Sequence, residues 1–280
     1  MPLFSPKSTF QAILAGGTDR GTVRPNNEDA LLFYNLTKTE KLNTRASEAT
    51  IGDQGVLLLV SDGMGGANAG EVASQLATDT FVECLQNALD GDEKKPGGKE
   101  IPTLMKTACV EAHKKILETA QAEPEKQGMG ATLTAVWLMQ TKAWWVHIGD
   151  TRLYHLNKES IVQITSDHTP VWKNYQEGLL TFEEARNHPT RNLLDQALGA
   201  ELEEIHPDTG CLTLEKEDCL LLTTDGLTDA VDNATLYELV SERAKWSLPT
   251  AYQYLNRHAR EVDGVDNITI ALCRITEQES

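Results

Sequence analysis

The sequence is poor in positive charge. It has 25 Lys and Arg residues against 42 Asp and Glu residues, which leaves a net charge of −17 at pH 7. Such a charge repels phosphate backbones and anionic lipid, so the composition argues against nucleic acid and membrane surfaces as partners. An acidic chain of this kind suits a protein that concentrates divalent cations.

Cysteines and long apolar segments are scarce as well. The five cysteines are odd in number and contain no Cys-x-x-Cys pair, which argues against a disulfide scaffold or a zinc ribbon. No apolar run approaches the ~20 residues that span a bilayer, and the first residues do not have the pattern of a signal peptide. The sequence therefore predicts a cytoplasmic protein with reduced thiols.

The length of 280 residues is enough for one large domain, and no internal repeat interrupts it. We expect a single domain over residues 1–280. A stretch rich in Gly, Pro and charge at 90–100 predicts a surface loop between helices. A second polar stretch, at 37–55, predicts a long hairpin loop between two strands.

Two hydrophobic periodicities alternate along the chain. Short runs of β-branched and aromatic residues predict strands at 30–34, 56–60, 131–139, 144–148, 152–156, 219–223 and 268–275. Apolar residues at four-residue spacing predict helices at 71–89, 102–120, 234–244 and 249–262. Because the helices come in consecutive pairs with runs of strands between them, the pattern favours an α+β fold with antiparallel sheets over a Rossmann fold.

Acidic residues stand at the ends of four predicted strands. They are Asp62, Asp150, Asp225 and Asp266. A single Asp beside Gly after a strand is usually part of a turn, but aligned strand ends can bring four carboxylates together. Clustered carboxylates repel each other unless a cation lies between them. Oxygen ligands without a His or Cys cluster indicate Mg²⁺ or Mn²⁺ rather than zinc.

These positions belong to a series of short motifs. In chain order they are DRG at 19–21, RPNNED at 24–29, DGMGG at 62–66, GMGAT at 128–132, GDTR at 149–152, TDGLTD at 224–229 and DNIT at 266–269. The series resembles the metal-dependent protein serine/threonine phosphatases of the protein phosphatase 2C family, in their short bacterial form. The resemblance implies an α-β-β-α sandwich, in which two antiparallel sheets lie face to face between helix pairs.

The resemblance also implies which residues hold metal ions. Asp62 would bridge two ions, and the carbonyl of Gly63 would bind the first of them. Asp225 and Asp266 would bind the second ion, while Asp150 would bind a third, weaker one. The alternative for Asp150 is an ion pair with Arg152 or a place in a turn. Two cations roughly 3.5–4 Å apart can lower the pKa of a water held between them and direct it at phosphorus.

The remaining roles concern the substrate and the surrounding water. Arg24 would grip the substrate phosphate, since a guanidinium binds two phosphate oxygens at once and stays charged. Glu28, Asp29 and Asn267 would orient metal-bound waters. Some family members, mainly eukaryotic, carry a His that protonates the leaving oxygen at the position of Met64. Methionine has no proton to donate, so a metal-bound water would have to supply it.

The sequence thus predicts hydrolysis of phosphoserine and phosphothreonine in proteins, which reverses the action of a Ser/Thr kinase, by a monomeric enzyme. A catalytically weak phosphoprotein-binding module of the same fold is the alternative, and the complete set of Asp62, Asp225 and Asp266 argues against it. A nucleotidase is disfavoured by the net charge of −17 and by the lack of a Gly-rich nucleotide loop. The polar, irregular segment 167–199, with a capping box at 181–184, predicts a flap that influences substrate choice.

Overall fold

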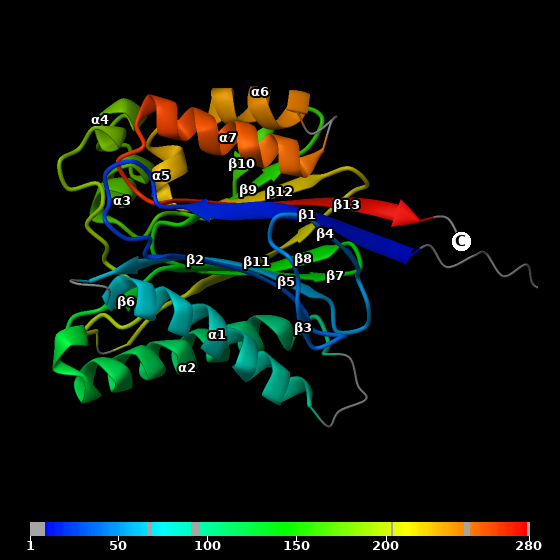
Figure 1. Ribbon diagram of the computed structural model, residues 1–280, viewed down its shortest axis with the longest axis horizontal. Helices are drawn as coiled ribbons and strands as arrows, with labels where there is room; N and C mark the ends of the chain where they lie inside the picture. The colour runs from blue at the N-terminus through cyan, green and yellow to red at the C-terminus, as the bar shows by residue number, and fades with distance from the viewer. Residues whose placement is uncertain (1–8, 66–68, 91–95, 203, 244–246, 279–280) are drawn as a thin grey trace, which may run out of the picture.

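Two antiparallel sheets lie face to face, and a pair of helices covers the outer side of each (Figure 1). The computed structural model describes residues 9–65, 69–90, 96–202, 204–243 and 247–278. This arrangement is the α-β-β-α sandwich that the sequence predicts. None of the described helices combines the length and the apolar content that crossing a membrane requires.

The first sheet joins the two ends of the chain. In the described residues its strand order is β10-β9-β12-β13-β1-β4. The strands are β1 (Thr9–Asp19), β4 (Ser47–Thr50), β9 (Arg152–Leu156), β10 (Ile161–Gln163), β12 (Cys219–Thr223) and β13 (Ile268–Gln278). β1 and β13 pair along their whole length, from Thr9 opposite Gln278 to Asp19 opposite Ile268. The sheet therefore exists only when both ends of the chain are in place.

The second sheet has the strand order β11-β8-β7-β5-β2-β3, and the short β6 also pairs with β5. Its strands are β2 (Asp29–Asn35), β3 (Glu40–Lys41), β5 (Val56–Met64), β6 (Gly130–Ala131), β7 (Leu133–Met139), β8 (Lys142–Ile148) and β11 (Asp208–Thr213). β5 is central and is buried from Val56 to Ser61. Such a continuous apolar run fits a strand that is covered on both faces.

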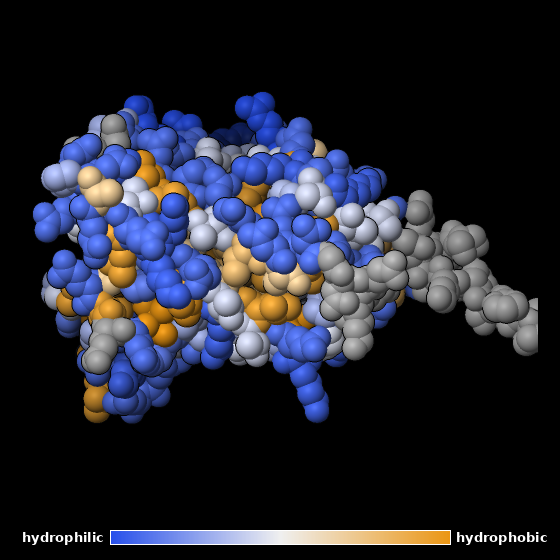
Figure 2. Space-filling view, turned by 90° about the horizontal axis from the view of Figure 1, so that it is seen from below, coloured by the Kyte–Doolittle hydropathy of each residue, from blue (hydrophilic) through white to orange (hydrophobic). Residues whose placement is uncertain are grey.

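Three apolar clusters separate the layers. α1 (Ala69–Leu89) and α2 (Ile101–Ala122) pack on the second sheet, and α6 (Asn233–Arg243) and α7 (Leu248–Val262) pack on the first. The third cluster, which includes Phe33, lies between the sheets. Pro249 lies in the first turn of α7, and the side chain of Ser247 caps that helix. Figure 2 shows the α1 and α2 side, which is mostly hydrophilic with scattered apolar areas.

Every predicted strand and helix is present, but the sequence missed several elements. The segment 37–55, predicted as a loop, contains β3 and β4, and β1 and β11 were not predicted. β4 and β11 are edge strands with little buried surface, so their side chains lack the apolar alternation that marks a strand. The predicted loop at 90–100 lies partly outside the described residues, as does residue 244 at the end of a predicted helix.

Two short helices form in the irregular segment 167–199. They are α3 (Pro170–Gln176) and α4 (Phe182–Arg186). The capping box is confirmed: Thr181 accepts a hydrogen bond from the backbone N–H of Glu184, and Glu184 accepts one from the backbone N–H of Thr181. A further short helix, α5 (Asp225–Thr228), directly follows β12, and one 3₁₀ turn spans Pro124–Lys126. Both α3 and α5 lie at the same end of the sandwich (Figure 1).

Candidate active site

Asp29 and Asp62 lie opposite each other in the antiparallel pair of β2 and β5. The backbone N–H of Asp62 donates to Oγ1 of Thr132 at 2.9 Å, and the N–H of Thr132 donates to the carbonyl of Asp62 at 2.9 Å. This pair of hydrogen bonds fixes the end of β5 against the residue that precedes β7. The register of one sheet thus places two of the predicted site carboxylates side by side.

The first sheet supplies the other carboxylates at the same end of the sandwich. Asp225 opens α5 directly after β12, and Asp266 lies two residues before β13. A buried hydroxyl joins the two sheets here, because Oγ1 of Thr224 donates to Oδ2 of Asp29 at 2.9 Å. Oγ1 of Thr224 also accepts a hydrogen bond from the backbone N–H of Thr269 at 3.0 Å.

Asn267 holds the loop that carries Arg24 and Glu28. Its side-chain oxygen accepts from the backbone N–H of Glu28 at 2.8 Å, and its side-chain nitrogen donates to the carbonyls of Arg20 and Asn26, each at 2.9 Å. The amide group is therefore committed to loop backbone. That Asn267 orients water stays a prediction.

Glycine at position 63 allows three segments to meet closely. The backbone N–H of Gly63 donates to the carbonyl of Glu28 at 3.1 Å. A Cβ at this position would lie 2.0 Å from the carbonyl oxygen of Gly70, at the start of α1, and 2.6 Å from that of Glu28. Any other residue would push the helix or the loop away from the strand end, so Gly63 is required by packing.

Burial and mutual repulsion raise the pKa values of the clustered carboxylates. Burial raises the pKa of Asp62 well above its usual range, and the charges of Asp29, Asp225, Asp150 and Asp266 raise it further. Burial likewise raises the pKa of Asp29 to about 7 and that of Asp150 to about 7. The pKa of Asp225 is raised for the same reason, and after burial the largest contribution comes from Asp150. These residues therefore share one electrostatic environment that disfavours negative charge without a counter-ion.

One cationic side chain offsets part of this charge. The guanidinium of Arg24 donates to Oδ2 of Asp266 at 2.7 Å, and this bond is the main reason that the pKa of Arg24 is raised. Half of the Arg24 side chain is exposed, so it sits at the mouth of the site. Burial raises the pKa of Glu28, which lies near both residues.

The carboxylates have the chemistry of a site for hard divalent cations. The Oδ1 atoms of Asp29 and Asp225 are buried and accept no hydrogen bond from the described residues, which is unfavourable unless a cation compensates them. Within the described ranges, no three His, Cys, Asp or Glu side chains are spaced to enclose a metal ion as they stand. The donor set fits Mg²⁺ or Mn²⁺.

Asp150 does not pair with Arg152 in the structure. Arg152 instead binds both carboxylate oxygens of Asp167, with Nε–Oδ1 and Nη2–Oδ2 distances of 2.9 and 2.6 Å. Asp150 thus remains available to the carboxylate cluster, and Arg152 connects β9 to the start of the segment 167–199.

Sequence reasoning missed several residues that position this site. Thr132 and Thr224 hold Asp62 and Asp29, and Asp167 and Asp229 bind arginines beside Asp150 and Asp225. Thr132, Thr224 and Asp229 all stand inside the quoted motifs, so the motif boundaries were the available signal. No pattern near Asp167 indicated its partner.

The site and fold can now be compared with known proteins. The family model for protein phosphatase 2C matches residues 40–259, which is more than half of the chain. The chain belongs to the protein phosphatase 2C family. The serine/threonine phosphatase Stp of Listeria innocua is 33% identical over 256 residues, which cover 91% of this chain and 92% of that protein.

Solved structures of phosphatases agree with this assignment. The serine/threonine phosphatase of S. agalactiae superposes with a TM-score of 0.79 and 29% identity, and covers 94% of this chain and 99% of that one. The catalytic domain of the phosphatase PstP, in complex with two manganese ions, gives a TM-score of 0.76 and 31% identity over 96% of this chain and 100% of that one. The fold of these phosphatases thus extends over nearly the whole of this chain.

Proposed function

We propose that this site hydrolyses phosphate monoesters of serine and threonine in proteins, with Asp62, Gly63, Asp225 and Asp266 as the metal-binding residues. Membership of the protein phosphatase 2C family makes the chain a metal-dependent serine/threonine protein phosphatase. The observation that supports the site most strongly is the convergence of carboxylates from both sheets on Asp62, whose pKa they raise. Such a cluster has no evident structural benefit, because it destabilises the metal-free fold.

The residues of the chain would hold two divalent ions, Mn²⁺ or Mg²⁺, and a third, weaker one at Asp150. Two manganese ions in the structure of PstP support this number. Divalent cations in such a site supply Lewis acidity toward phosphate and activate water as a nucleophile. The buried Oδ1 atoms of Asp29 and Asp225, which accept no hydrogen bond from the described residues, support the same proposal, because a cation would compensate their negative charge. Asp29, with Glu28, would orient water beside the ions.

Arg24 would bind the phosphate group of the substrate. Its guanidinium has five N–H donors, and its bond to Asp266 uses only part of this capacity. Half-exposed at the mouth of the site, it can present the remaining donors to two phosphate oxygens. Asn267 would act by fixing the loop between Arg20 and Glu28, on which Arg24 stands.

The leaving serine or threonine oxygen needs a proton from a group other than Met64. The buried His147 is a poor donor, because burial lowers its pKa to about 3, and its Nδ1 lies 2.8 Å from Oγ1 of Thr134. Water within the carboxylate cluster remains as the source that the sequence predicts.

The class of substrate and the domain organisation are also proposals. Phosphorylated proteins modified by a Ser/Thr kinase would be the substrates, and 167–199 would be a flap subdomain of a single domain over 1–280. A monomeric state and a cytoplasmic location stay predictions.

An activity assay tests the proposed function directly. With Mn²⁺, the protein should hydrolyse p-nitrophenyl phosphate and a phosphothreonine peptide, and EDTA should abolish both activities. Binding of the peptide without turnover would instead support a phosphoprotein-binding module.

A further inference from the structure

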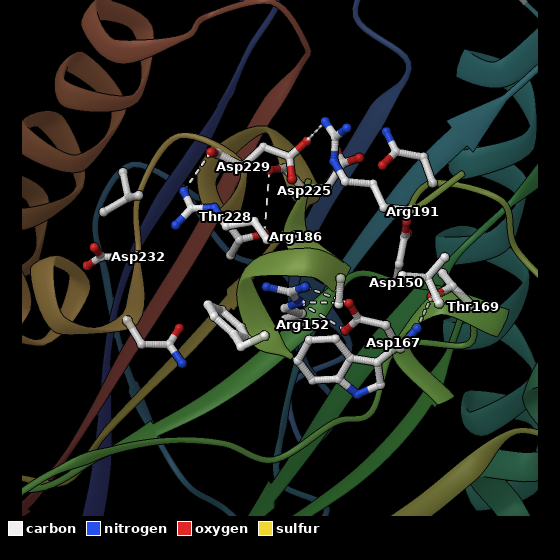
Figure 3. A pocket seen from close by; sticks show the side chains of 17 residues that line it. Asp150, Arg152, Asp167, Thr169, Arg186, Arg191, Asp225, Thr228, Asp229 and Asp232 are labelled. Atoms are coloured by element: carbon white, nitrogen blue, oxygen red, sulfur yellow. Dashed lines mark hydrogen bonds and ion pairs between the residues drawn. The ribbon is translucent and has the colours of Figure 1, made fainter. Parts of the chain in front are cut away.

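A pocket lies beside the carboxylate cluster, between the core and the segment 167–199. Asp150 and Asp225 line one part of it, and Val171, Trp172 and Phe182 of α3 and α4 line another. Figure 3 shows the charged residues of this pocket gathered around its interior. The pocket therefore borders the proposed catalytic site, with which it shares Asp150 and Asp225.

The arginines of the pocket are already engaged. Arg152 binds Asp167, with an Nη2–Oδ2 distance of 2.6 Å, and Arg191 binds Oδ2 of Asp229 at 2.8 Å. Arg186 donates to the backbone carbonyl of Asp229 at 2.9 Å, so two arginines converge on this residue (Figure 3). The pocket lining includes five aspartates and three arginines, so its net charge is negative and disfavours a second phosphate or an acidic side chain.

The apolar part of the pocket is held rigidly. Phe182 is 41% exposed although it is a large apolar residue, and its ring packs edge-on to Tyr175 and Trp172 with centroid distances of 5.8 and 6.5 Å. The guanidinium of Arg152 lies 5.0 Å from the centroid of the Trp172 ring. The ion pair between Arg152 and Asp167 thus holds the guanidinium against the Trp172 ring. A preformed, partly exposed aromatic surface binds an apolar side chain at little cost in conformational entropy.

We propose that this pocket, which we call the flap-side subsite, binds an apolar side chain of the substrate protein. That side chain belongs to a residue that flanks the phosphorylated Ser or Thr. The inference rests on the proposed function, since the pocket shares Asp150 and Asp225 with the metal-binding cluster. Phe182 is its specificity-determining residue, and Val231 adds a further apolar side chain to the lining.

The test compares phosphothreonine peptides that carry Leu or Ser at each of the flanking positions. In the wild-type enzyme with Mn²⁺, kcat/KM should be about tenfold higher for Leu at one or two positions. The Phe182→Ala variant should lose this preference. The matched control is Leu179→Ala, since Leu179 is 68% exposed in the same segment and does not line the pocket; it should keep the preference.

A second variant guards against a general defect of folding. Phe182→Glu places a charge at a partly exposed position, and should replace the preference for Leu by one for Lys. Equal rates for Leu and Ser peptides in the wild type, or an unchanged preference in both Phe182 variants, would overturn the subsite. If the wild type hydrolyses neither peptides nor p-nitrophenyl phosphate, the proposed function itself fails, and the inference falls with it.

Discussion

The guanidinium of Arg24 and the carboxylate of Asp266 are joined at 2.7 Å, although 242 residues separate them in the sequence. One belongs to the loop that precedes β2, and the other to the turn that precedes β13. The proposed phosphate-binding residue and a proposed metal ligand are therefore direct partners. If both roles hold, substrate binding and metal binding act on the same pair of side chains.

Replacing Arg24 by Ala should raise KM for a phosphopeptide about tenfold or more, with a smaller change in kcat. The guanidinium contacts phosphate in the bound substrate as well as in the transition state, so its loss weakens binding first. Steady-state kinetics with a phosphothreonine peptide measures both constants. Arg257→Ala, on α7, is the control, because its guanidinium stacks on Tyr254. An unchanged KM in Arg24→Ala would remove this residue from the phosphate site.

The proposed metal ligands Asp62 and Asp266 can be tested with two measurements. Asp62→Asn and Asp266→Ala should abolish hydrolysis at saturating Mn²⁺ while the protein stays folded. In Asp62→Asn, the melting temperature of the metal-free protein should rise. Burial and neighbouring charges raise the pKa of the Asp62 carboxylate, and the variant removes this unfavourable charge. Full turnover in either variant would refute the assignment of the site.

The stability of the metal-free protein should fall as the pH rises from about 4 to 7. The pKa values of Asp29 and Asp150 are raised to about 7 in the fold, so the folded state binds more protons than the unfolded chain between roughly pH 4 and 7. Their ionisation in the fold then costs free energy, on the order of a few kcal/mol. Chemical denaturation with EDTA present measures this trend.

Saturating Mn²⁺ is the control for this experiment. A bound cation favours the ionised carboxylates, so it should flatten or reverse the loss of stability above pH 6. A metal-free protein that becomes more stable between pH 4 and 7 would contradict the raised pKa values.

Asp150→Ala should keep two tightly bound metal ions and lose much of its turnover, more on phosphopeptides than on p-nitrophenyl phosphate. A site with few protein carboxylates binds a metal weakly, and its water is one source of the proton that Met64 lacks. The aryl leaving group needs little protonation, whereas a serine alkoxide needs a full proton. Titration calorimetry with Mn²⁺ and parallel rates on both substrates measure the two effects. If the variant binds as much Mn²⁺ as the wild type and hydrolyses the peptide at the wild-type rate, Asp150 has only a structural role.

Asp167→Asn should destabilise the fold by about 2 to 4 kcal/mol, because it leaves the mostly buried Arg152 without its bidentate partner. Urea unfolding measures the loss. The double variant Arg152→Met, Asp167→Leu should recover much of it, since it removes both charges at once. Glu111→Gln breaks an exposed pair with Lys114 and should change stability little. Equal effects of Asp167→Asn and Glu111→Gln would contradict the structural role of this pair.

Local pattern alone determined much of this protein. Periodicity predicted the strands and helices with large buried faces, such as β5 and α2, because their side chains repeat with the geometry of the backbone. The motifs predicted Asp62, Asp225 and Asp266 as a cluster, since each stands at the end of a recognisable strand.

The tertiary structure decided the contacts between segments that are distant in sequence. The pairing of β1 with β13, the hydrogen bond from Thr224 to Asp29 and the ion pair of Arg152 with Asp167 have no local signal. Edge strands such as β4 were missed for the same reason, since only a neighbouring strand stabilises them. A pattern of single residues reports which face of an element is buried, but which partner buries it depends on how the whole chain packs.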